Sequence, residues 1–286
     1  MIIDGRQAAE LVLNQVKAEI DRDLLIGMRS PMLVLILVGD DPASHAYVRT
    51  KSRAAQKAGI RTQVVQLSAA HSQERLLRMI EQFNNDPEVD AVLVQLPLPT
   101  GYDARTVLAA VHPDKDPDGL HPVNVGRLWL GQPAIEACTP RGICFLLDHA
   151  GIRLDGKRAV IVSRSNLVGK PLAKMLLDRN ATVTLAHSHT QNLPELCRQA
   201  DLLVAATGVP RLITSDYVKP GAVVIDVGIS HLPDGQLSGD VCFEQVEPLA
   251  SAITPVPGGV GPMTVAMLMD NTFKCYLRNI ENKYKH

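Results

Sequence analysis

Tyr47 and Lys51 stand four residues apart in the segment SHAYVRTKSRAAQKAG, residues 44 to 59. On a helix this spacing places both side chains on one face. A phenol beside an ammonium group can take part in proton transfer, so the pair is a candidate catalytic couple. An ordinary solvated helix can carry the same two residues, so the interpretation depends on what else the chain supplies.

One interpretation of the Tyr-x-x-x-Lys pattern is a short-chain dehydrogenase, in which the tyrosine donates a proton and the lysine assists it. The order of the motifs argues against this class. In such enzymes a Gly-rich nucleotide loop precedes the pair, whereas here the candidate nucleotide loop starts far downstream, at Ser163. We therefore expect Tyr47 and Lys51 to lie in a different domain from the nucleotide and to act across a cleft.

Other polar groups could join the pair in that cleft. Gln95 ends the apolar run DAVLVQL, and the loop KDPDGLHP supplies Lys115, Asp116 and Asp118. The segment ITPVPGGVGPMT, residues 253 to 264, is rich in glycine and proline, which fix an irregular backbone that a ligand can approach closely. Taken singly, each of these features is compatible with a purely structural role.

The elements that must position these groups alternate along the chain. Short apolar runs separated by helix-periodic segments are typical of parallel sheets covered on both faces, so we expect an α/β fold with two α/β units. The expected strands are residues 32–38, 62–67, 90–96, 158–162, 182–186, 201–206 and 222–227, with helices near 45–58, 72–84, 169–179 and 194–199.

A polar stretch punctuated by proline and glycine, residues 112–133, separates the two series of strands and is the expected domain boundary. We place the N-terminal domain at residues 1–122 and a Rossmann-like domain at 123–264. A terminal helix at about 265–286 is expected to pack on the N-terminal domain. Helix caps are expected at Thr139, for a helix ending near Gly151, and at Thr264.

The second series opens with a strand, a tight turn, a helix and a strand over residues 155–190, a unit that can place pyrophosphate at a helix N-terminus. The G-x-G-x-x-G pattern is missing. Ser163, Arg164 and Ser165 stand in its place, and Gly169 is the one glycine of the turn. An ordinary βα turn is an equal alternative from this loop alone. Small residues at the strand ends TGVP and DVGIS favour ligand binding.

The strand TVTLA runs into His187-Ser188-His189-Thr190, where no carboxylate is present to accept from a ribose 2′-OH. Arg164 projects toward the same region, and a guanidinium with hydroxyl donors suits a 2′-phosphate. The sequence therefore favours NADP over NAD, with a merely solvated Arg164 as the alternative.

Composition excludes several classes. The chain has 286 residues, 46% of them hydrophobic, and a formal net charge of −1, without the basic stripe that a nucleic-acid partner requires. Its longest apolar run, residues 32–38, is too short for a membrane span, and the N-terminus lacks a signal-peptide pattern. Five scattered cysteines without a CxxC fit a reduced cytoplasm. His187 and His189 lack further ligands, so no metal site is expected.

Over its whole length the chain resembles the bifunctional methylenetetrahydrofolate dehydrogenase/methenyltetrahydrofolate cyclohydrolase family. The combination of VQLPLP with TPVPGGVGPMT is the most specific part of this resemblance. The other motifs follow in the family's order and spacing: VGDDPASHAYVRTKSRAAQKAGI, PDKDPDGLHPVNVGRL, CTPRG, SRSNLVGKP and GAVVIDVGI.

The resemblance implies an NADP-dependent dehydrogenase and cyclohydrolase that uses a small-molecule folate substrate and forms a homodimer. It makes Lys51 the acid/base group, Tyr47 its positioning and stacking partner, Gln95 a modulator of the lysine and Asp118 the anchor of the pterin. Together with these four residues, Gly259 and Pro262 are expected to contact the substrate.

For the cofactor, the resemblance places Ser163, Arg164 and Ser165 on the NADP phosphates, Ser188 near the 2′-phosphate and Ile229 beside the nicotinamide. The chain departs from the common family pattern at two positions. Ser163 replaces a glycine, which costs about 1 kcal/mol of strain if the position needs a positive φ. Pro117 in KDPDG replaces a valine and stiffens the approach to Asp118.

Three alternatives remain at this point. The chain could be another two-domain NADP dehydrogenase, for example of the shikimate type, although such an enzyme has no need of VQLPLP. It could be a family member that keeps only the dehydrogenase, although Lys51 is retained. It could also be a non-catalytic folate- or nucleotide-binding protein, which the set of Tyr47, Lys51, Gln95 and Asp118 argues against.

Overall fold

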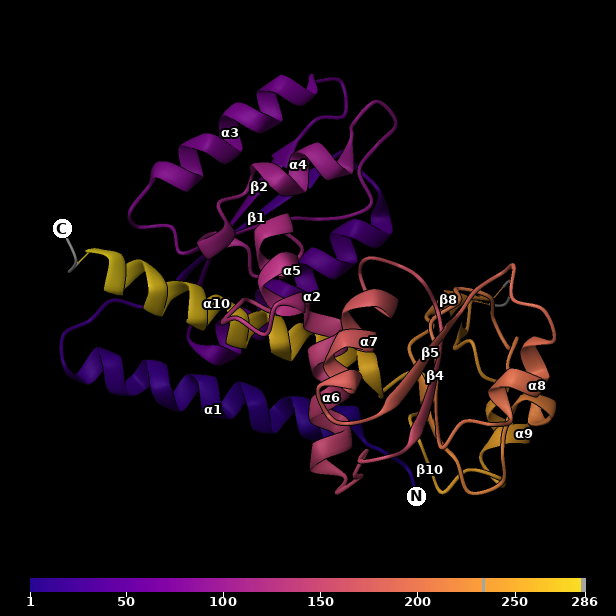
Figure 1. The fold of residues 1–286 in the computed structure, drawn as a ribbon. Coiled ribbons are helices and arrows are strands. Elements are labelled where there is room, and N and C mark those ends of the chain that lie inside the picture. The colour runs from indigo at the N-terminus through magenta and orange to yellow at the C-terminus, as the bar shows by residue number, and fades with distance from the viewer. Residues whose placement is uncertain (233–234, 284–286) are drawn as a thin grey trace. The chain divides into compact units, whose positions relative to one another are not determined.

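The structure is a computed structural model that describes residues 1–232 and 235–283. The chain separates into two compact units (Figure 1). The three-stranded unit comprises Glu10–Cys138 and the stretch from Val265 onward. The five-stranded unit comprises Met1–Ala9 and Thr139–Thr264.

The sheet of the three-stranded unit is parallel throughout, in the order β2-β1-β3. The central strand, which is paired on both sides, is buried along nearly its whole length. The edge strand β2 is largely exposed, with Val64 at 50% exposure, so the expectation of a buried strand at 62–67 was right in position and wrong in burial. The strands are β1 (Met32–Val38), β2 (Arg61–Leu67) and β3 (Ala91–Val94).

The helix that follows β1, α2 (Pro42–Ala58), has well-defined ends. Asp41 caps its N-terminus by accepting from the Ser44 N–H at 2.8 Å, and Gly59 ends it with a φ of 81°. These caps fix the helix that carries Tyr47 and Lys51. The other helices placed wholly or mainly in this unit are α1 (Gly5–Leu25), α3 (Gln73–Asn85), α4 (Ala104–Ala110), the 3₁₀ turn η1 (Pro113–Lys115) and α5 (Pro122–Trp129).

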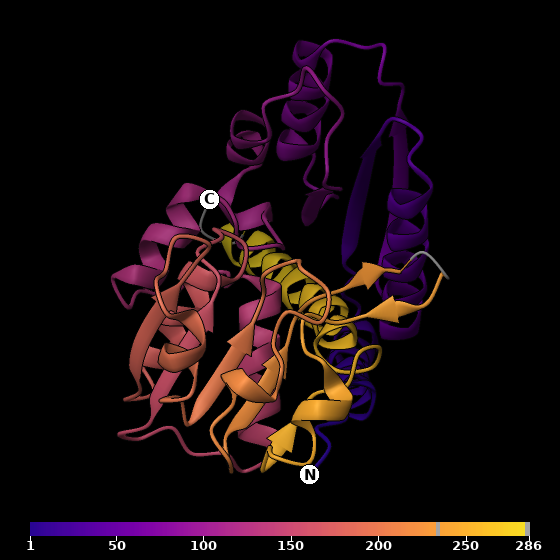
Figure 2. The same ribbon diagram turned by 90° about the vertical axis from the view of Figure 1, so that its right-hand side faces the viewer.

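The sheet of the five-stranded unit is also parallel, in the order β10-β7-β6-β4-β5 (Figure 2). Its strands are β4 (Arg158–Val162), β5 (Thr182–Ala186), β6 (Leu202–Ala205), β7 (Val223–Asp226) and β10 (Ala252–Ile253). The accompanying elements are α6 (Cys138–His149), α7 (Gly169–Leu177), α8 (Leu193–Cys197), the 3₁₀ turn η2 (Ser215–Tyr217), α9 (Phe243–Val246) and the antiparallel pair β8 (Ser230–His231) and β9 (Leu237–Ser238).

The strand order defines where a ligand would bind. From β4 the chain first adds β5 on one side and then returns to add β6 on the other. The carboxyl ends of β4 and β6 therefore flank the switch point, where open α/β sheets bind their ligands. The prediction of a Rossmann-like α/β domain is confirmed in its parallel, doubly wound character.

The division into units differs from the predicted bounds in two places. The first residues of the chain lie along β10, with the Ile3 N–H donating to the Ile253 carbonyl at 2.8 Å, so they belong to the five-stranded unit. Residues 123–138 belong to the three-stranded unit, because the Asn124 amide donates to the Pro113 carbonyl and to Asp116. The predicted cleft between two domains stays a prediction.

Two predicted helix caps are wrong. The helix expected to start after Thr139 begins at Cys138, and the Thr139 hydroxyl instead lies 2.9 Å from the Thr264 hydroxyl. The terminal helix, α10 (Val260–Lys283), begins before Thr264, whose hydroxyl donates to the Val260 carbonyl one turn earlier. Residues 284–286 of the predicted terminal helix lie outside the described residues.

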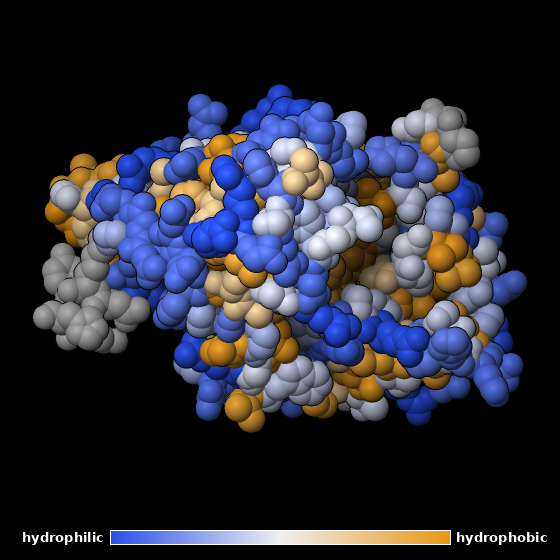
Figure 3. Space-filling model, turned by 90° about the horizontal axis from the view of Figure 1, so that it is seen from above, coloured by the Kyte–Doolittle hydropathy of each residue, from blue (hydrophilic) through white to orange (hydrophobic). Residues whose placement is uncertain are grey.

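The surface mixes polar and apolar residues on the face shown in Figure 3. Among residues 1–232 and 235–283, no helix combines the length and apolar character needed to cross a membrane. All five cysteines are buried, and none of them forms a disulfide.

Candidate active site

The Tyr-x-x-x-Lys pair lies on α2, as predicted from its spacing. Lys51 is half-buried, and its Nζ donates a hydrogen bond of 3.0 Å to the Gln95 Oε1. Gln95 is 7% exposed and follows β3 directly. Its own Nε2 donates to the Leu96 carbonyl, which fixes the amide so that its oxygen faces the lysine. Tyr47 is 47% exposed, so its ring is open to a ligand.

Asp118 lies half-buried in the loop between η1 and α5, and its neighbours hold that loop rigidly. The buried Asp116 carboxylate accepts from the Gly119 N–H at 3.1 Å and the His121 N–H at 2.8 Å. It also accepts from the Asn124 side chain at 3.0 Å. Burial raises the pKa of Asp116, and the hydrogen bonds from His121 and Asn124 partly offset this shift.

The same loop is tied to the rest of its unit from the other side. Asn271 on α10 is fully buried, and its Nδ2 donates to the Pro117 carbonyl at 2.9 Å and the Glu136 carbonyl at 2.8 Å. The buried Lys115 donates to the Phe83 and Asp86 carbonyls, at 2.9 and 2.7 Å. Both side chains satisfy backbone carbonyls, so they set the path of the backbone through Asp118.

A pocket of about 420 Å³ opens at the switch point of the five-stranded sheet, a volume typical of small-molecule sites. It brings together four of the five residues predicted to bind the cofactor: Ser163, Arg164, Ser165 and Ser188. Its remaining lining residues are Val162, His187, Leu193, Ala206, Thr207, Val209 and Leu212.

The turn after β4 is shaped by its own serines. The Ser165 hydroxyl accepts from the Val168 and Gly169 N–H groups, at 3.1 and 3.3 Å, and so caps α7. Ser163 is 7% exposed. A Cβ at Gly169 would lie 2.4 Å from the Ser163 carbonyl oxygen, so this glycine is needed for the helix to start so close to the strand.

The strain considered at Ser163 is absent. Among the described residues, the non-glycine positions with a positive φ are Asn180, Asn192 and Arg211. Serine therefore stands at position 163 without the cost expected for a left-handed conformation.

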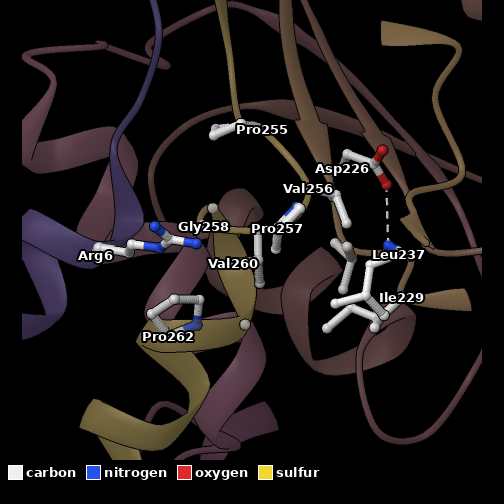
Figure 4. Close-up of a pocket in the computed structure, with 14 residues that line it drawn as sticks. Arg6, Asp226, Ile229, Leu237, Pro255, Val256, Pro257, Gly258, Val260 and Pro262 are labelled. Atoms are coloured by element: carbon white, nitrogen blue, oxygen red, sulfur yellow. Dashed lines mark hydrogen bonds between the residues drawn. The ribbon is translucent and has the colours of Figure 1, made fainter. Parts of the chain in front are cut away.

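A second pocket of the five-stranded unit holds the remaining predicted residues of this unit (Figure 4). Ile229, Gly259 and Pro262 line it together, as do Asp226 and Arg6. The Arg6 side chain points toward Gly258 in this view. The start of α1 is locked to the Gly-rich loop, because the Gly5 N–H donates to the Gly258 carbonyl at 2.9 Å.

The family models match both halves of the chain. Residues 3–118 match the tetrahydrofolate dehydrogenase/cyclohydrolase catalytic domain, and residues 137–280 match the NAD(P)-binding domain of the same family. The chain belongs to the tetrahydrofolate dehydrogenase/cyclohydrolase family.

Individual members of the family are similar over nearly the full length. The bifunctional protein FolD of Streptococcus equi subsp. zooepidemicus strain H70 is 50% identical over 279 residues, 98% of each chain. The crystal structure of the bifunctional FolD enzyme from Campylobacter jejuni superposes with a TM-score of 0.95 at 44% identity, covering 97% of this chain and 99% of that one.

A third relative carries a bound cofactor. The Trypanosoma brucei dehydrogenase-cyclohydrolase, described as complexed with NADP cofactor and inhibitor, gives a TM-score of 0.93 at 38% identity and covers 98% of each chain. Membership of this family removes the alternative of a shikimate-type dehydrogenase. The confirmed predictions thus include the family, the two-domain α/β fold, and the pairing of a dehydrogenase/cyclohydrolase catalytic domain with an NAD(P)-binding domain.

In this family member the donor set of the switch-point pocket fits a phosphorylated dinucleotide. The pocket combines the Arg164 guanidinium with three serine hydroxyls, and both kinds of group interact favourably with phosphate. Within the described residues, no group of three or more His, Cys, Asp or Glu side chains could hold a metal ion.

Sequence reasoning missed several lining residues. Thr207 is the first residue of TGVP and Asp226 the first residue of DVGIS, two segments whose small residues were noticed, but neither residue was assigned a role. Arg6 gave no signal at all, because only the fold brings the chain start beside the loop at Gly258.

Proposed function

We propose that the chain oxidises 5,10-methylenetetrahydrofolate to 5,10-methenyltetrahydrofolate with NADP and then hydrolyses that product to 10-formyltetrahydrofolate. The observation that carries this proposal is the hydrogen bond from Lys51 to Gln95. This hydrogen bond holds the Lys51 ammonium group in place for proton transfer. The hydrolysis requires proton transfer, whereas the hydride step does not.

In the oxidation, the residues of the chain bind and orient. Ser163, Arg164, Ser165 and Ser188 would hold the phosphates of NADP, and Ile229 would lie beside its nicotinamide. When bound, NADP supplies the acceptor for a hydride from the methylene carbon. No acid or base is required for that step, so positioning of the two reactants accounts for the catalysis.

In the hydrolysis, water adds to the methenyl carbon and loses a proton. The bond from this carbon to N5 then breaks as the added hydroxyl loses its remaining proton and N5 takes up a proton, which leaves the formyl group on N10 and releases one proton overall. Lys51 is the group proposed to transfer these protons, with Gln95 holding its ammonium. Tyr47 offers an exposed ring on which the folate can stack.

Asp118 would anchor the pterin, since one carboxylate can accept from the ring N–H and the adjacent amino group. The loop bonds of Asp116 and Asn271 support this assignment, because they hold the backbone on both sides of Asp118. Gly259 and Pro262 are proposed as further substrate contacts, on the ground that both line a pocket with Ile229.

We also propose that the protein works as a homodimer in the cytoplasm. Family resemblance supports the dimer. The five buried thiols support a reducing compartment.

The test is an assay of the purified chain with 5,10-methylenetetrahydrofolate and NADP. The proposal predicts reduced cofactor together with 10-formyltetrahydrofolate. Accumulation of the methenyl compound at its spontaneous rate of hydrolysis would instead identify a family member that keeps only the dehydrogenase. A preference for NAD over NADP would refute the assignment of Arg164 and Ser188.

A further inference from the structure

Two buried carboxylates lie at the carboxyl edge of the five-stranded sheet, outside the predicted set of site residues. Asp226, the last residue of β7, is 4% exposed. It accepts from three backbone N–H groups: Gly228 at 3.0 Å, Asp240 at 2.9 Å and Val241 at 2.9 Å. Figure 4 marks the first of these bonds with a dashed line. Asp226 therefore ties the turn after β7 to the segment that contains Asp240.

Asp240 extends the connection to the neighbouring strand. It is fully buried, and its Oδ2 accepts from the Thr207 N–H and, at 3.1 Å, from the Gly208 N–H. Both amides follow the end of β6. Its other oxygen, Oδ1, is buried without a hydrogen bond from the described residues. That oxygen faces Gly228, where an added Cβ would lie 2.2 Å away.

The two carboxylates thus connect two strand ends that line different pockets. Thr207 lines the pocket at the switch point, with Arg164 and Ser188. Gly228 lines the other pocket, with Ile229 and Gly259. A dinucleotide has a phosphate-rich adenosine half and a nicotinamide half, so a ligand that uses both pockets needs them at a fixed spacing.

We propose that Asp226 and Asp240 are positioning residues that hold the two halves of the dinucleotide site in register. This inference rests on the proposed function, because it assigns the two pockets to the two halves of NADP. Neither residue needs to contact the cofactor. Each acts through the backbone of Thr207–Gly208 or of Gly228–Ile229.

A purely structural role explains the arrangement less well. Burial disfavours the charged form and raises the pKa of Asp226 to about 6, and one oxygen of Asp240 receives no hydrogen bond from the described part of the chain. Apolar packing could join two strand ends at a lower free-energy cost. The two buried carboxylates lie at the edge of the sheet where ligands bind. They accept hydrogen bonds from backbone amides, which apolar side chains cannot do.

The test compares Asp240→Ala with Asp240→Asn, and both with Asp201→Asn as the matched control. An asparagine can still accept from the Thr207 and Gly208 amides, and its NH₂ can take the place of the oxygen that lacks a donor. Asp201 is a carboxylate of the same sheet that accepts from the Arg158 N–H at 2.9 Å and from Lys219 at 2.7 Å, and it lies at the start of β6. It lines neither pocket.

Three readouts are needed: the Kd of NADP by titration calorimetry, the dehydrogenase kcat, and the cyclohydrolase rate without cofactor. Asp240→Ala should weaken NADP binding and slow hydride transfer by about tenfold or more, because two amides lose a charged acceptor. Its cyclohydrolase rate should stay within about twofold of the unsubstituted chain. Asp240→Asn should recover most of the NADP affinity, and Asp201→Asn should leave all three readouts unchanged.

Equal losses of both activities in Asp240→Ala would overturn the inference, since they would indicate general unfolding. Unchanged NADP affinity in Asp240→Ala would overturn it as well. If the unsubstituted chain lacked dehydrogenase activity altogether, the proposed function would fail first, so the two failures are distinguishable.

Discussion

Lys51 and Gln95 are 44 residues apart in the chain, and the lysine Nζ lies 3.0 Å from the glutamine Oε1. The contact depends on two elements with different geometry. Helix α2 presents Lys51 on the face that also carries Tyr47, and the end of β3 delivers Gln95. Strands β1 and β3 are parallel neighbours, so their carboxyl ends lie at the same edge of the sheet. The connection from β1 to α2 starts at this edge, and Gln95 follows the end of β3 at the same edge.

The assignment of Arg164 and Ser188 predicts cofactor selectivity. Arg164→Ala removes the guanidinium from the switch-point pocket, so the KM for NADP should rise by about tenfold or more, while the KM for NAD changes little. Ser188→Ala should act in the same direction and more weakly. Steady-state kinetics with both cofactors measures the effect. Equal changes for the two cofactors would show that Arg164 does not contact the 2′-phosphate.

Substitution of Gly169 should reduce the dehydrogenase activity and leave the cyclohydrolase activity unchanged. In Gly169→Ala the new methyl group would lie 2.4 Å from the Ser163 carbonyl, so the turn that carries Arg164 must move. We expect weaker NADP binding and an unchanged cyclohydrolase rate. Gly126→Ala is the control, because its Cβ meets no atom within 4 Å and it lies in α5. That variant should be neutral or about 1 kcal/mol more stable. A Gly169→Ala variant with normal NADP affinity would contradict the account.

Asn271 predicts a coupled effect on stability and folate binding. Asn271→Ala leaves the buried Pro117 carbonyl and the partly buried Glu136 carbonyl without this donor, which should lower the free energy of unfolding by about 2–4 kcal/mol. The loop that presents Asp118 should loosen, so the KM for folate should rise while the Kd of NADP stays the same. Urea unfolding and kinetics measure the two effects. A stability loss with an unchanged folate KM would separate Asn271 from the site.

Asp226 predicts a specific pH dependence of stability. Burial raises its pKa from 3.8 to about 6, so between these values the folded state binds more protons than the unfolded state. The contribution of Asp226 is therefore largest below about pH 4 and falls as the pH rises through 6. The full difference is about 3 kcal/mol. Asp226→Asn should remove this slope in urea unfolding at pH 4.5 to 7.5. An identical slope in the variant would show that Asp226 does not titrate in this range.

The sequence predicted the strands better than the helix ends. The strands at 32–38 and 158–162 begin and end where the apolar runs do, because a parallel strand covered on both faces must be apolar. The strand at 182–186 also has the predicted bounds, although it is an edge strand and only Ala186 is buried. Thr139 and Thr264 were wrong as caps, since each helix starts earlier and each hydroxyl has another partner. Local sequence favours several starting points, and tertiary contacts select among them.

The site residues that could be predicted are those whose side chains carry the required chemical group, such as Lys51, Gln95 and Arg164. The supporting residues could not. Arg6 and Asp240 reach their pockets or strand ends only through contacts between segments distant in sequence. Asn271 lies 154 residues from the carbonyl that it holds. Ser163 stands where the family pattern has glycine, which suggested backbone strain from a positive φ. The φ of Ser163 is not positive, so this strain is absent.

The central claim is that Lys51 transfers protons in the hydrolysis and is dispensable for the hydride step. Its most direct test measures both activities of Lys51→Met, with Lys57→Met as the control on the same helix, where Lys57 forms an exposed ion pair with Glu10. We predict that the cyclohydrolase rate of Lys51→Met falls by roughly 100-fold or more while hydride transfer to NADP remains measurable. Full cyclohydrolase activity in Lys51→Met would contradict the account.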